Sequence, residues 1–537
     1  MNQEARTHKT KIKRHKLIHF LRDNYIFALI ITLAVALRTY HLLQNYALWW
    51  DSSIYLAVAK YIYSSGTSGL WEPYRPLVHP ILLGFFWKLG ANIAAIGKIL
   101  DLIFSITTIT LSFQITKKLY SKAAGLYTAF ILAIEPLFIM YTGLILTEPL
   151  ALTIALLTIY LFITQNSLHS PLKSLEQKYR HLSIGVLAAL AALTKFPLGV
   201  IFFAMLLARQ LDDSFKYKNI QKRMQSLKQS IYYCLGFTIP FIPYLIFNYI
   251  KYKDPLLPFT TGSWIVTTFL WQYDTNFWFY FTHFFGVHQI FLLLMIAIPI
   301  YFIKKDFKDE GRTTIFLSAT LLFCYFWLQV PRKEVRYLVL VLPFFAILIG
   351  PILATIQQKI TEFYKKITTY SDGKPVTWQK VIPFFSAITV LIIILVSQTN
   401  PNISIAYTYS EYQTPLEELG EYIEENQFEG MILASSPYIA EHIDNSLFPT
   451  AGVDLAEAVY DHEYGRFDYV LLVDCDLVCQ EGDAECEEAK DQFFKRVDQE
   501  QVLIYYDNYS FKHQTCNLFF YLIEDKFKEN YENQSLN

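Results

Sequence analysis

The sequence is poor in charge and lacks several motifs, and each absence excludes a class of protein. Charged residues make up 17% of the 537 residues, whereas 53% are hydrophobic and 17% are aromatic. This composition is too apolar for one soluble globule. The chain has no dinucleotide-binding fingerprint and no phosphate-binding loop, which argues against a nucleotide-powered enzyme. Its halves show no self-similarity, an absence that weakens the case for a transporter.

Cysteine is also scarce, and four of the six cysteines lie near the C-terminus, at Cys475, Cys479, Cys486 and Cys516. They lack the paired spacing of zinc sites and stand among many carboxylates, so a metal site is the weaker interpretation. In an oxidising compartment they would form one or two disulfides. The sequence leaves the three possible full pairings open.

Basic residues are rare in the same region. From Asn400 onward there are about 29 acidic and 7 basic residues, which leaves about 18 acidic and 39 basic residues before it. We therefore expect three parts: a basic cytoplasmic N-terminus at 1–24, an apolar transmembrane body at 25–398, and an acidic extracytoplasmic domain at 399–537.

The body contains repeated apolar runs close to the roughly 20 residues that span a hydrocarbon core. A cleavable signal peptide is not expected, because the first run starts late and lacks a small-residue cleavage site. The candidate runs are 25–43, 92–116, 123–141, 145–164, 182–208, 231–250, 287–303, 313–330, 337–357 and 381–397.

Charge predicts the topology. The basic segment Lys9–Lys16 should stay in the cytoplasm by the positive-inside rule. The later basic loops agree only if 182–208 crosses twice, with a break at Thr194-Lys195-Phe196-Pro197. This gives about eleven helices in an integral protein of the cell membrane, with the C-terminal domain outside.

The acidic tail alternates helix-like and strand-like segments, which predicts a small α/β domain. Its expected helix is 415–427, and its expected strands are 430–435, 469–473, 501–506 and 517–523. Sequons at Asn402, Asn508 and Asn533 are compatible with an outer location.

The first predicted outer loop contains Trp49-Trp50-Asp51. A carboxylate among apolar neighbours has its pKa biased upward, toward the value that a general base needs. Asp51 could instead be a helix N-cap beside two interfacial tryptophans. About twenty residues later, the proline-rich stretch 73–80 should be stiff and non-helical, and it would fix Arg75 where it can bind a phosphate or a lipid headgroup.

Three further charged positions fall on the same predicted side. Glu148 lies at the start of an apolar helix, where it has either a functional or a helix-dipole role. Lys195 lies in the middle of the predicted hairpin and needs an anion, either a carboxylate or a ligand phosphate. The turn 331–337 contains Arg332 and Arg336 and violates the charge rule, unless these side chains merely snorkel.

Together these positions supply a candidate base and several cations. That inventory suits displacement at a carbon atom whose leaving group is a phosphate, because a carboxylate activates the acceptor and the cations neutralise the leaving group.

In their order along the chain and in their residues, these segments resemble those of the GT-C superfamily, specifically the family of dolichyl-phosphate-mannose-protein mannosyltransferases and lipid A aminoarabinose transferases. The matching segments are Asp51, 75–80, Thr147-Glu148, 193–197, and Arg336-Tyr337 with Pro343. The resemblance implies an α-helical polytopic fold and inverting transfer of a sugar from a polyprenyl-phosphate donor. It implies Asp51 as catalytic base and a substrate-binding set of Arg75, His79, Glu148, Lys195, Arg332, Arg336 and Tyr337.

The chain departs from the family pattern at Ser52, where Glu is frequent, and at Val78 in the proline-rich stretch. Both departures leave the acceptor open among protein, lipid and glycan. The partners expected besides the acceptor are the donor and membrane lipids, with no nucleic acid; no cofactor is implied, although a divalent metal is possible. The tail has no tryptophan, so the chain is not expected to be an oligosaccharyltransferase. The alternative functions are a transporter or lipid flippase with an extracytoplasmic domain, and a receptor whose acidic tail binds a partner.

Overall fold

The computed structural model describes residues 24–44, 48–165, 173–216, 220–265, 267, 270–285, 288–369, 414–450, 452–511 and 514–523. The predicted crossing at 381–397 and the sequons at Asn402 and Asn533 lie outside this part of the chain. Asn508 is described and exposed, on a strand of the C-terminal domain.

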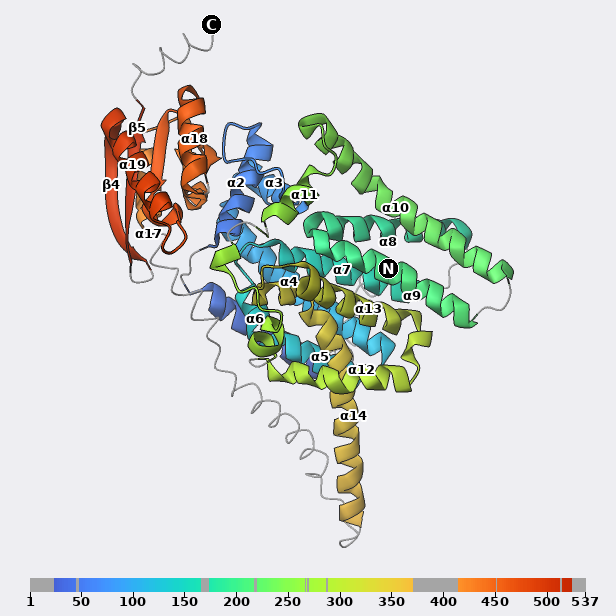
Figure 1. Ribbon diagram of the computed structural model, residues 1–537. Helices are drawn as coiled ribbons and strands as arrows, with labels where there is room; N and C mark the ends of the chain where they lie inside the picture. Colours follow the sequence, from blue (N-terminus) through green and yellow to red (C-terminus); the bar gives the residue numbers. More distant parts are fainter. Residues whose placement is uncertain are drawn as a thin grey trace, which may run out of the picture.

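The protein is an α-helical polytopic membrane protein with a small C-terminal sheet domain (Figure 1). Within the described residues, six helices are long and apolar enough to cross a membrane, at Asn24–Leu42, Ile93–Leu119, Thr147–Thr164, Ser226–Tyr252, Glu310–Gln329 and Leu342–Phe363. The predicted total of about eleven is not established by this set. The body helices are α4 (Ile93–Leu119), α5 (Lys122–Ile134), α6 (Pro136–Met140), α7 (Thr147–Thr164), α8 (Lys173–Thr194), α9 (Gly199–Lys216), α10 (Ile220–Tyr252), α11 (Leu257–Ile265), α12 (Leu294–Ile303), α13 (Glu310–Cys324) and α14 (Leu342–Thr369).

Prolines divide two of the predicted apolar runs. The run 182–208 breaks where predicted, because α8 ends at Thr194 and the short helix η1 (Phe196–Leu198) contains Pro197. The run 123–141 was expected to be continuous but is interrupted at Glu135, which caps α6 by accepting a hydrogen bond from the Phe138 amide. Pro136 follows as the first residue of α6, where a proline costs no helical hydrogen bond.

Two short helices, α2 (Trp50–Ser64) and α3 (Val78–Lys88), pack against each other, and α2 also contacts the C-terminal domain. The prediction that the chain is non-helical through Pro80 is wrong, because α3 already begins at Val78. Pro80 lies in the first turn of α3, where its missing amide proton is not needed. Shorter turns complete the body: η2 (Leu270–Gln272), η3 (Tyr280–Phe284), η4 (Gln289–Leu293), η5 (Asp306–Lys308), η6 (Tyr325–Gln329) and η7 (Val335–Leu340).

The C-terminal domain contains a five-stranded mixed sheet with the strand order β2-β1-β3-β5-β4. β1 pairs in parallel with both β2 and β3, whereas β5 runs antiparallel to β3 and β4. The predicted helix and all four predicted strands are present, and β2 is an additional strand. The elements are α17 (Thr414–Glu425), β1 (Met431–Ala434), η10 (Pro437–Glu441), β2 (Ser446–Pro449), α18 (Val453–Glu463), η11 (Tyr464–Arg466), β3 (Tyr469–Val473), η12 (Asp474–Asp476), α19 (Ala484–Glu500), β4 (Val502–Phe511) and β5 (Gln514–Leu522).

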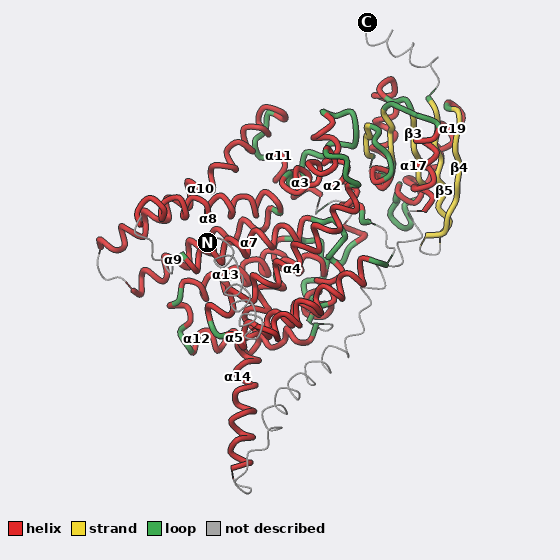
Figure 2. The backbone as a smooth tube through the Cα atoms, turned by 180° about the vertical axis from the view of Figure 1, so that it is seen from behind, coloured by secondary structure: helices red, strands yellow, loops and turns green. Residues whose placement is uncertain are grey.

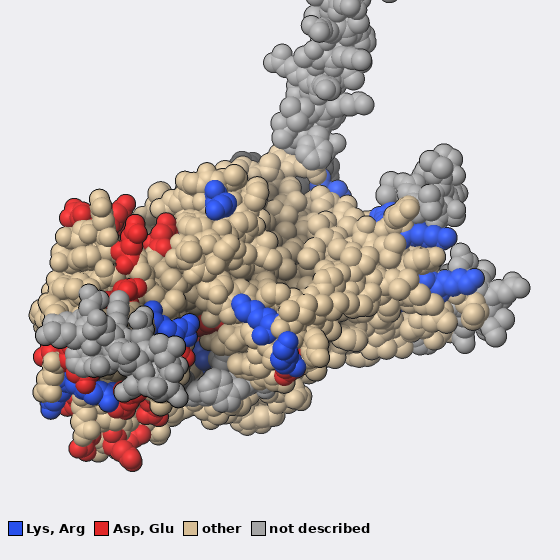
Figure 3. Space-filling view, turned by 90° about the horizontal axis from the view of Figure 1, so that it is seen from above, with Lys and Arg blue, Asp and Glu red and all other residues tan. Residues whose placement is uncertain are grey.

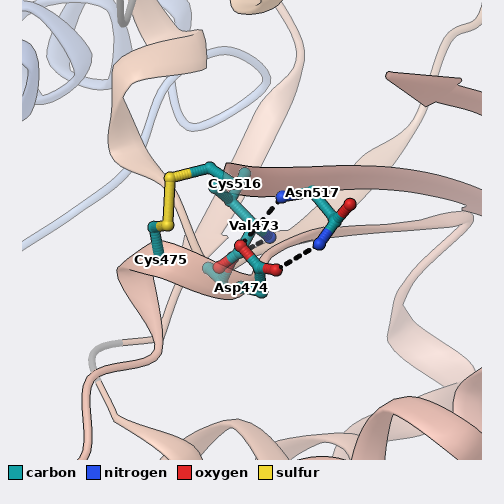
Figure 4. Close-up of a disulfide and its surroundings, with 6 residues drawn as sticks. Val473, Asp474, Cys475, Cys516 and Asn517 are labelled. Atoms are coloured by element: carbon teal, nitrogen blue, oxygen red, sulfur yellow. Dashed lines mark hydrogen bonds between the residues drawn. A yellow bond between two sulfur atoms is a disulfide. The ribbon is translucent and has the colours of Figure 1, made fainter. Parts of the chain in front are cut away.

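Two disulfides join the four tail cysteines, as Cys475–Cys516 and Cys479–Cys486. The first ties the end of β3 to β5 (Figure 4), where Asp474 also accepts hydrogen bonds from the backbone and side-chain amides of Asn517. Asp474 with Cys475 and Cys516 has the proximity of a metal site, but both sulfurs are consumed by the disulfide.

The C-terminal domain packs against α2, as both ribbon views show (Figures 1 and 2). Ile54, Ala57 and Val58 of α2 belong to the same buried cluster as residues of α17, β1 and β3. Lys60, almost fully buried, pairs with Asp444 at 2.8 Å. The helix that begins beside Asp51 is therefore held between the two parts of the molecule.

A glycine allows this close approach. Gly69 adds to the sheet edge: its amide donates to the Asn445 carbonyl, and its carbonyl accepts from the Leu447 amide, both at 2.8 Å. Its φ is +73°, and a Cβ atom there would come within 2.1 Å of the Ala57 carbonyl oxygen. Only glycine fits this position.

The charge division predicted from the sequence is visible on the surface. Seen from above (Figure 3), acidic side chains gather over the C-terminal domain, whereas the helical body is mostly uncharged with scattered Lys and Arg.

Candidate active site

Asp51 is held by two arginines from distant parts of the chain. Its Oδ1 atom lies 2.8 Å from Arg75 Nη1, and its Oδ2 atom lies 2.9 Å from Arg336 Nη1. The helix-cap interpretation is wrong, because Trp49 is the N-cap of α2 and Asp51 lies in the first turn. The side chain of Asp51 keeps 23% of its surface exposed, so it remains within reach of a ligand.

Each arginine also binds a second carboxylate that the sequence analysis missed. Arg75 Nε lies 2.6 Å from Glu72, and Arg336 Nε lies 2.8 Å from Glu334. Both glutamates stand within three residues of their arginine, and this proximity was the available signal. We refer to Asp51, Glu72, Arg75, Arg332, Glu334 and Arg336 as the Asp51 cluster.

The arginines reverse the pKa shift expected for Asp51. Burial alone would raise the pKa of this carboxyl, but the charges of Arg75, Arg336 and Lys195 together hold it well below its usual range. Burial acts in the opposite sense on Arg336, and the neighbouring carboxylates Glu334 and Asp51 overcome it and raise its pKa. Asp51 is therefore ionised, and each of its two oxygens is paired with an arginine.

Glu148 and Lys195 form a second pair beside this cluster. Lys195 Nζ lies 2.8 Å from Glu148 Oε1, and the Glu148 side chain is only 4% exposed. The lysine in the α8–α9 break thus has the carboxylate partner that its burial demands. Glu148 also lies in the first turn of α7, as the helix-dipole interpretation requires.

The loop before Glu148 is held by Asp101, a buried carboxylate of α4 that the sequence analysis missed. Asp101 Oδ2 accepts hydrogen bonds from the backbone amides of Gly143, at 3.2 Å, and Ile145, at 2.8 Å. Ile145 has a φ of +55°, a conformation that β-branched residues rarely adopt. Asp101 therefore stabilises a strained loop that leads into α7.

His79 is fully buried in α3 and faces the aromatic ring of Tyr55, with ring centroids 5.6 Å apart. Neither of its ring nitrogens has a hydrogen-bond partner within the described residues. Burial, opposed by Glu148 and assisted by Lys195, lowers the pKa of His79 to about 4. The ring is neutral at physiological pH and lies near the Glu148–Lys195 pair.

The remaining predicted residues have different surroundings. Arg332 pairs with Glu334 and stacks over the ring of Tyr273, 3.4 Å from its centroid. Tyr337 is buried and stacks on Phe326 at a centroid distance of 5.2 Å, so its ring fills the core. The snorkelling interpretation is wrong for Arg332 and Arg336, whose charges are paired with carboxylates.

The arrangement does not fit a divalent metal bound by Asp51. Both oxygens of Asp51 are occupied by guanidinium groups, as are oxygens of Glu72 and Glu334. A metal would have to displace arginines that carry the same sign of charge. No step proposed below uses a metal.

The chain is similar to one known family and to several solved structures. The family model for dolichyl-phosphate-mannose-protein mannosyltransferase matches residues 74–247. No curated protein sequence matches the chain. Among solved structures, ArnT from Cupriavidus metallidurans bound to undecaprenyl phosphate is similar, with a TM-score of 0.57 and 10% identity over 92% of this chain and 98% of that one.

The archaeal oligosaccharyltransferase AglB from Archaeoglobus fulgidus, in complex with an inhibitory peptide and a dolichol-phosphate, is also similar. Its TM-score is 0.51 at 12% identity, over 92% of this chain and 74% of that one. At such identity the likeness shows the fold. The match to the mannosyltransferase family model over part of the chain and the shared fold both agree with the resemblance predicted from the motifs.

Proposed function

We propose that the protein is an inverting glycosyltransferase that moves a sugar from a polyprenyl-phosphate donor to an acceptor at the outer face of the cell membrane. One observation carries the proposal: a carboxylate with partial exposure lies between two guanidinium groups, next to helices that cross the membrane. A base flanked by phosphate-binding groups is the arrangement that such a displacement needs.

The reaction is a single displacement. The acceptor oxygen or nitrogen bonds to the anomeric carbon while the bond from that carbon to the phosphate oxygen breaks. The electron pair of the broken bond stays on the phosphate, which departs as polyprenyl phosphate, and the acceptor proton passes to Asp51. Attack on the side opposite the leaving group inverts the anomeric configuration.

The arginines supply the electrostatic part. Departure of the phosphate adds one negative charge to it, and Arg75 and Arg336 are placed to neutralise that charge. Similar structures support the class of donor, because one was solved with undecaprenyl phosphate and another with a dolichol-phosphate. The sugar and the acceptor are open in this proposal.

Orientation is part of the proposal. The basic N-terminal segment Lys9–Lys16 favours a cytoplasmic N-terminus. The disulfides of the C-terminal domain favour an oxidising compartment for the opposite side. The Asp51 cluster, which lies at the start of the helix packed against that domain, would then face outward.

The test uses purified full-length protein with a panel of radiolabelled polyprenyl-phosphate sugars, and it measures sugar transfer or release to water. Asp51→Asn is compared with Asp454→Asn, a matched control because Asp454 is the second residue of α18 as Asp51 is of α2. We expect activity with wild type and the control and none with Asp51→Asn. Equal sugar release by wild type and Asp51→Asn would remove Asp51 from the proposed role.

A further inference from the structure

The two arginines of the Asp51 cluster are bound in the same way. Nη1 of each one donates to one oxygen of Asp51. Nε of Arg75 donates to Glu72, and Nε of Arg336 lies 2.8 Å from Glu334 in an ion pair without a hydrogen bond. Arg75 Nη2 has no hydrogen-bond partner within the described residues, whereas Arg336 also makes a side-chain hydrogen bond with Tyr337. Each guanidinium is thus held by carboxylates and keeps part of its side chain exposed, 14% for Arg75 and 18% for Arg336.

This arrangement conflicts with a free base. A carboxylate whose two oxygens both accept from guanidinium groups is a poor proton acceptor, because these charge-assisted bonds favour its ionised form. For Asp51 to take a proton from the acceptor, at least one arginine must change its partner.

We propose that Glu72 and Glu334 are positioning residues that let the donor phosphate replace Asp51 on the two arginines and so release Asp51 as the base. The inference rests on the proposed function and deepens it. The glutamates hold the Nε edges in place, while the phosphate oxygens bind the Nη atoms. The base then becomes available only after the donor has bound.

The charges of the cluster support this exchange. Asp51, Glu72 and Glu334 balance Arg75, Arg332 and Arg336, so the six side chains of the cluster are neutral in sum. A bound phosphodiester brings one negative charge. When the sugar leaves, the phosphate gains a second negative charge while Asp51 gains a proton. The net charge of the site is therefore unchanged by the reaction.

The glutamates also prevent a competing arrangement. An arginine without its Nε partner can turn both edges toward one carboxylate and bind it in the bidentate manner that guanidinium groups favour. For Arg75 and Arg336 that carboxylate would be Asp51. Removal of either glutamate is therefore expected to strengthen the binding of its arginine to Asp51.

The first test needs no turnover. Asp51 in the full-length protein is labelled with a carbodiimide and an amine, and mass spectrometry measures the labelled fraction with undecaprenyl phosphate or with uncharged undecaprenol. We expect the phosphate, and not the alcohol, to raise Asp51 labelling several-fold in wild type and in Glu463→Ala, whose exposed carboxylate pairs with Arg466. The rise should be absent in Glu72→Ala and Glu334→Ala. Unchanged or reduced labelling of wild type with the phosphate would overturn the inference.

The second test uses turnover. In Glu72→Ala and Glu334→Ala we expect kcat to fall about tenfold or more and the acid limb of its pH profile to move to lower pH, because loss of a nearby negative charge lowers the pKa of Asp51. Glu72→Asp should restore part of both effects. A lower kcat with an unmoved acid limb would assign the glutamates a structural role only and overturn the inference. A phosphate-dependent rise in labelling without any sugar transfer would instead contradict the proposed function.

Discussion

The protein has ion pairs at both ends of α7, and the two groups are built differently. At one end lie the Glu148–Lys195 pair and the adjacent Asp51 cluster. About 25 Å away along the helix, Gln165 is bonded to Tyr233, which accepts from Arg209. Arg209 also binds one carboxylate, Glu310, and the hydroxyl of Ser226.

Arg312, in the first turn of α13, follows the same pattern as Arg209. It pairs with Asp306 at 2.6 Å, and its Nε and Nη2 atoms donate to the Leu119 carbonyl. These arginines combine one carboxylate with neutral acceptors, and they join neighbouring helix ends. In contrast, Arg75 and Arg336 each pair with two carboxylates, one of which is Asp51 for both. We infer that Arg209 and Arg312 hold helices together, whereas Arg75 and Arg336 are arranged to exchange one anion for another.

The largest effect is expected from removing an arginine of the Asp51 cluster. Arg336→Ala removes a cation that neutralises the leaving phosphate, and we expect kcat/KM for the polyprenyl-phosphate sugar to fall roughly a thousandfold, as for loss of one strong transition-state contact. Steady-state kinetics measure the loss. Arg336→Lys, which keeps the charge but lacks the forked guanidinium group, should recover only part of the lost kcat/KM. A variant with near wild-type kinetics would contradict the assignment.

A second prediction concerns Arg312, one of the arginines that join neighbouring helix ends. Arg312→Gln should lower the free energy of unfolding by about 2 kcal/mol, because Asp306 is buried and loses its charged partner. Chemical denaturation in detergent measures this change, and kcat/KM of the folded fraction should stay within about twofold of wild type. A strong loss of turnover without loss of stability would erase the distinction between the two groups.

A smaller effect is expected at Asp101, which holds the loop before Glu148 without touching the Asp51 cluster. Asp101→Asn keeps one acceptor oxygen for the amides of Gly143 and Ile145 but replaces the other oxygen with an amide group. We expect kcat to fall about tenfold, which corresponds to roughly 1.4 kcal/mol, with little change in the KM for the donor. A changed KM alone would assign Asp101 to donor binding.

The smallest effect concerns the contact between the C-terminal domain and α2. Burial and, to a smaller extent, Lys60 lower the pKa of His442 to about 4. As pH falls below the ordinary histidine value of about 6.5, the unfolded state takes up the proton first, so stability should decline from there down to about pH 4. Thermal unfolding at pH 7 and pH 5 measures this decline, which His442→Gln should reduce. An equal decline in the variant would assign it to other groups.

Much of this architecture was predictable because it depends on local pattern. Pro197 beside Lys195 predicts the α8–α9 break, and the apolar run 469–473 predicts β3 to the residue. The strand β2 was missed because it is four residues long and ends in Pro449, as suits an edge strand.

The active site was predictable only in part. Asp51, Arg75 and Arg336 carried signals because a charge near apolar sequence demands a reason. Glu72 and Glu334 were overlooked because their role depends on where the arginines point, which is set by packing between distant segments. Asp101 lay inside an apolar run, and its partners are backbone amides that no side-chain pattern reveals.

The most direct test of the central claim is single-turnover transfer from a labelled polyprenyl-phosphate sugar with Asp51→Asn beside Asp454→Asn. We predict that Asp51→Asn still binds the donor, since the arginines are retained, but transfers sugar at least about a thousandfold more slowly, as expected when a general base is lost. Transfer by Asp51→Asn at the rate of Asp454→Asn would contradict it.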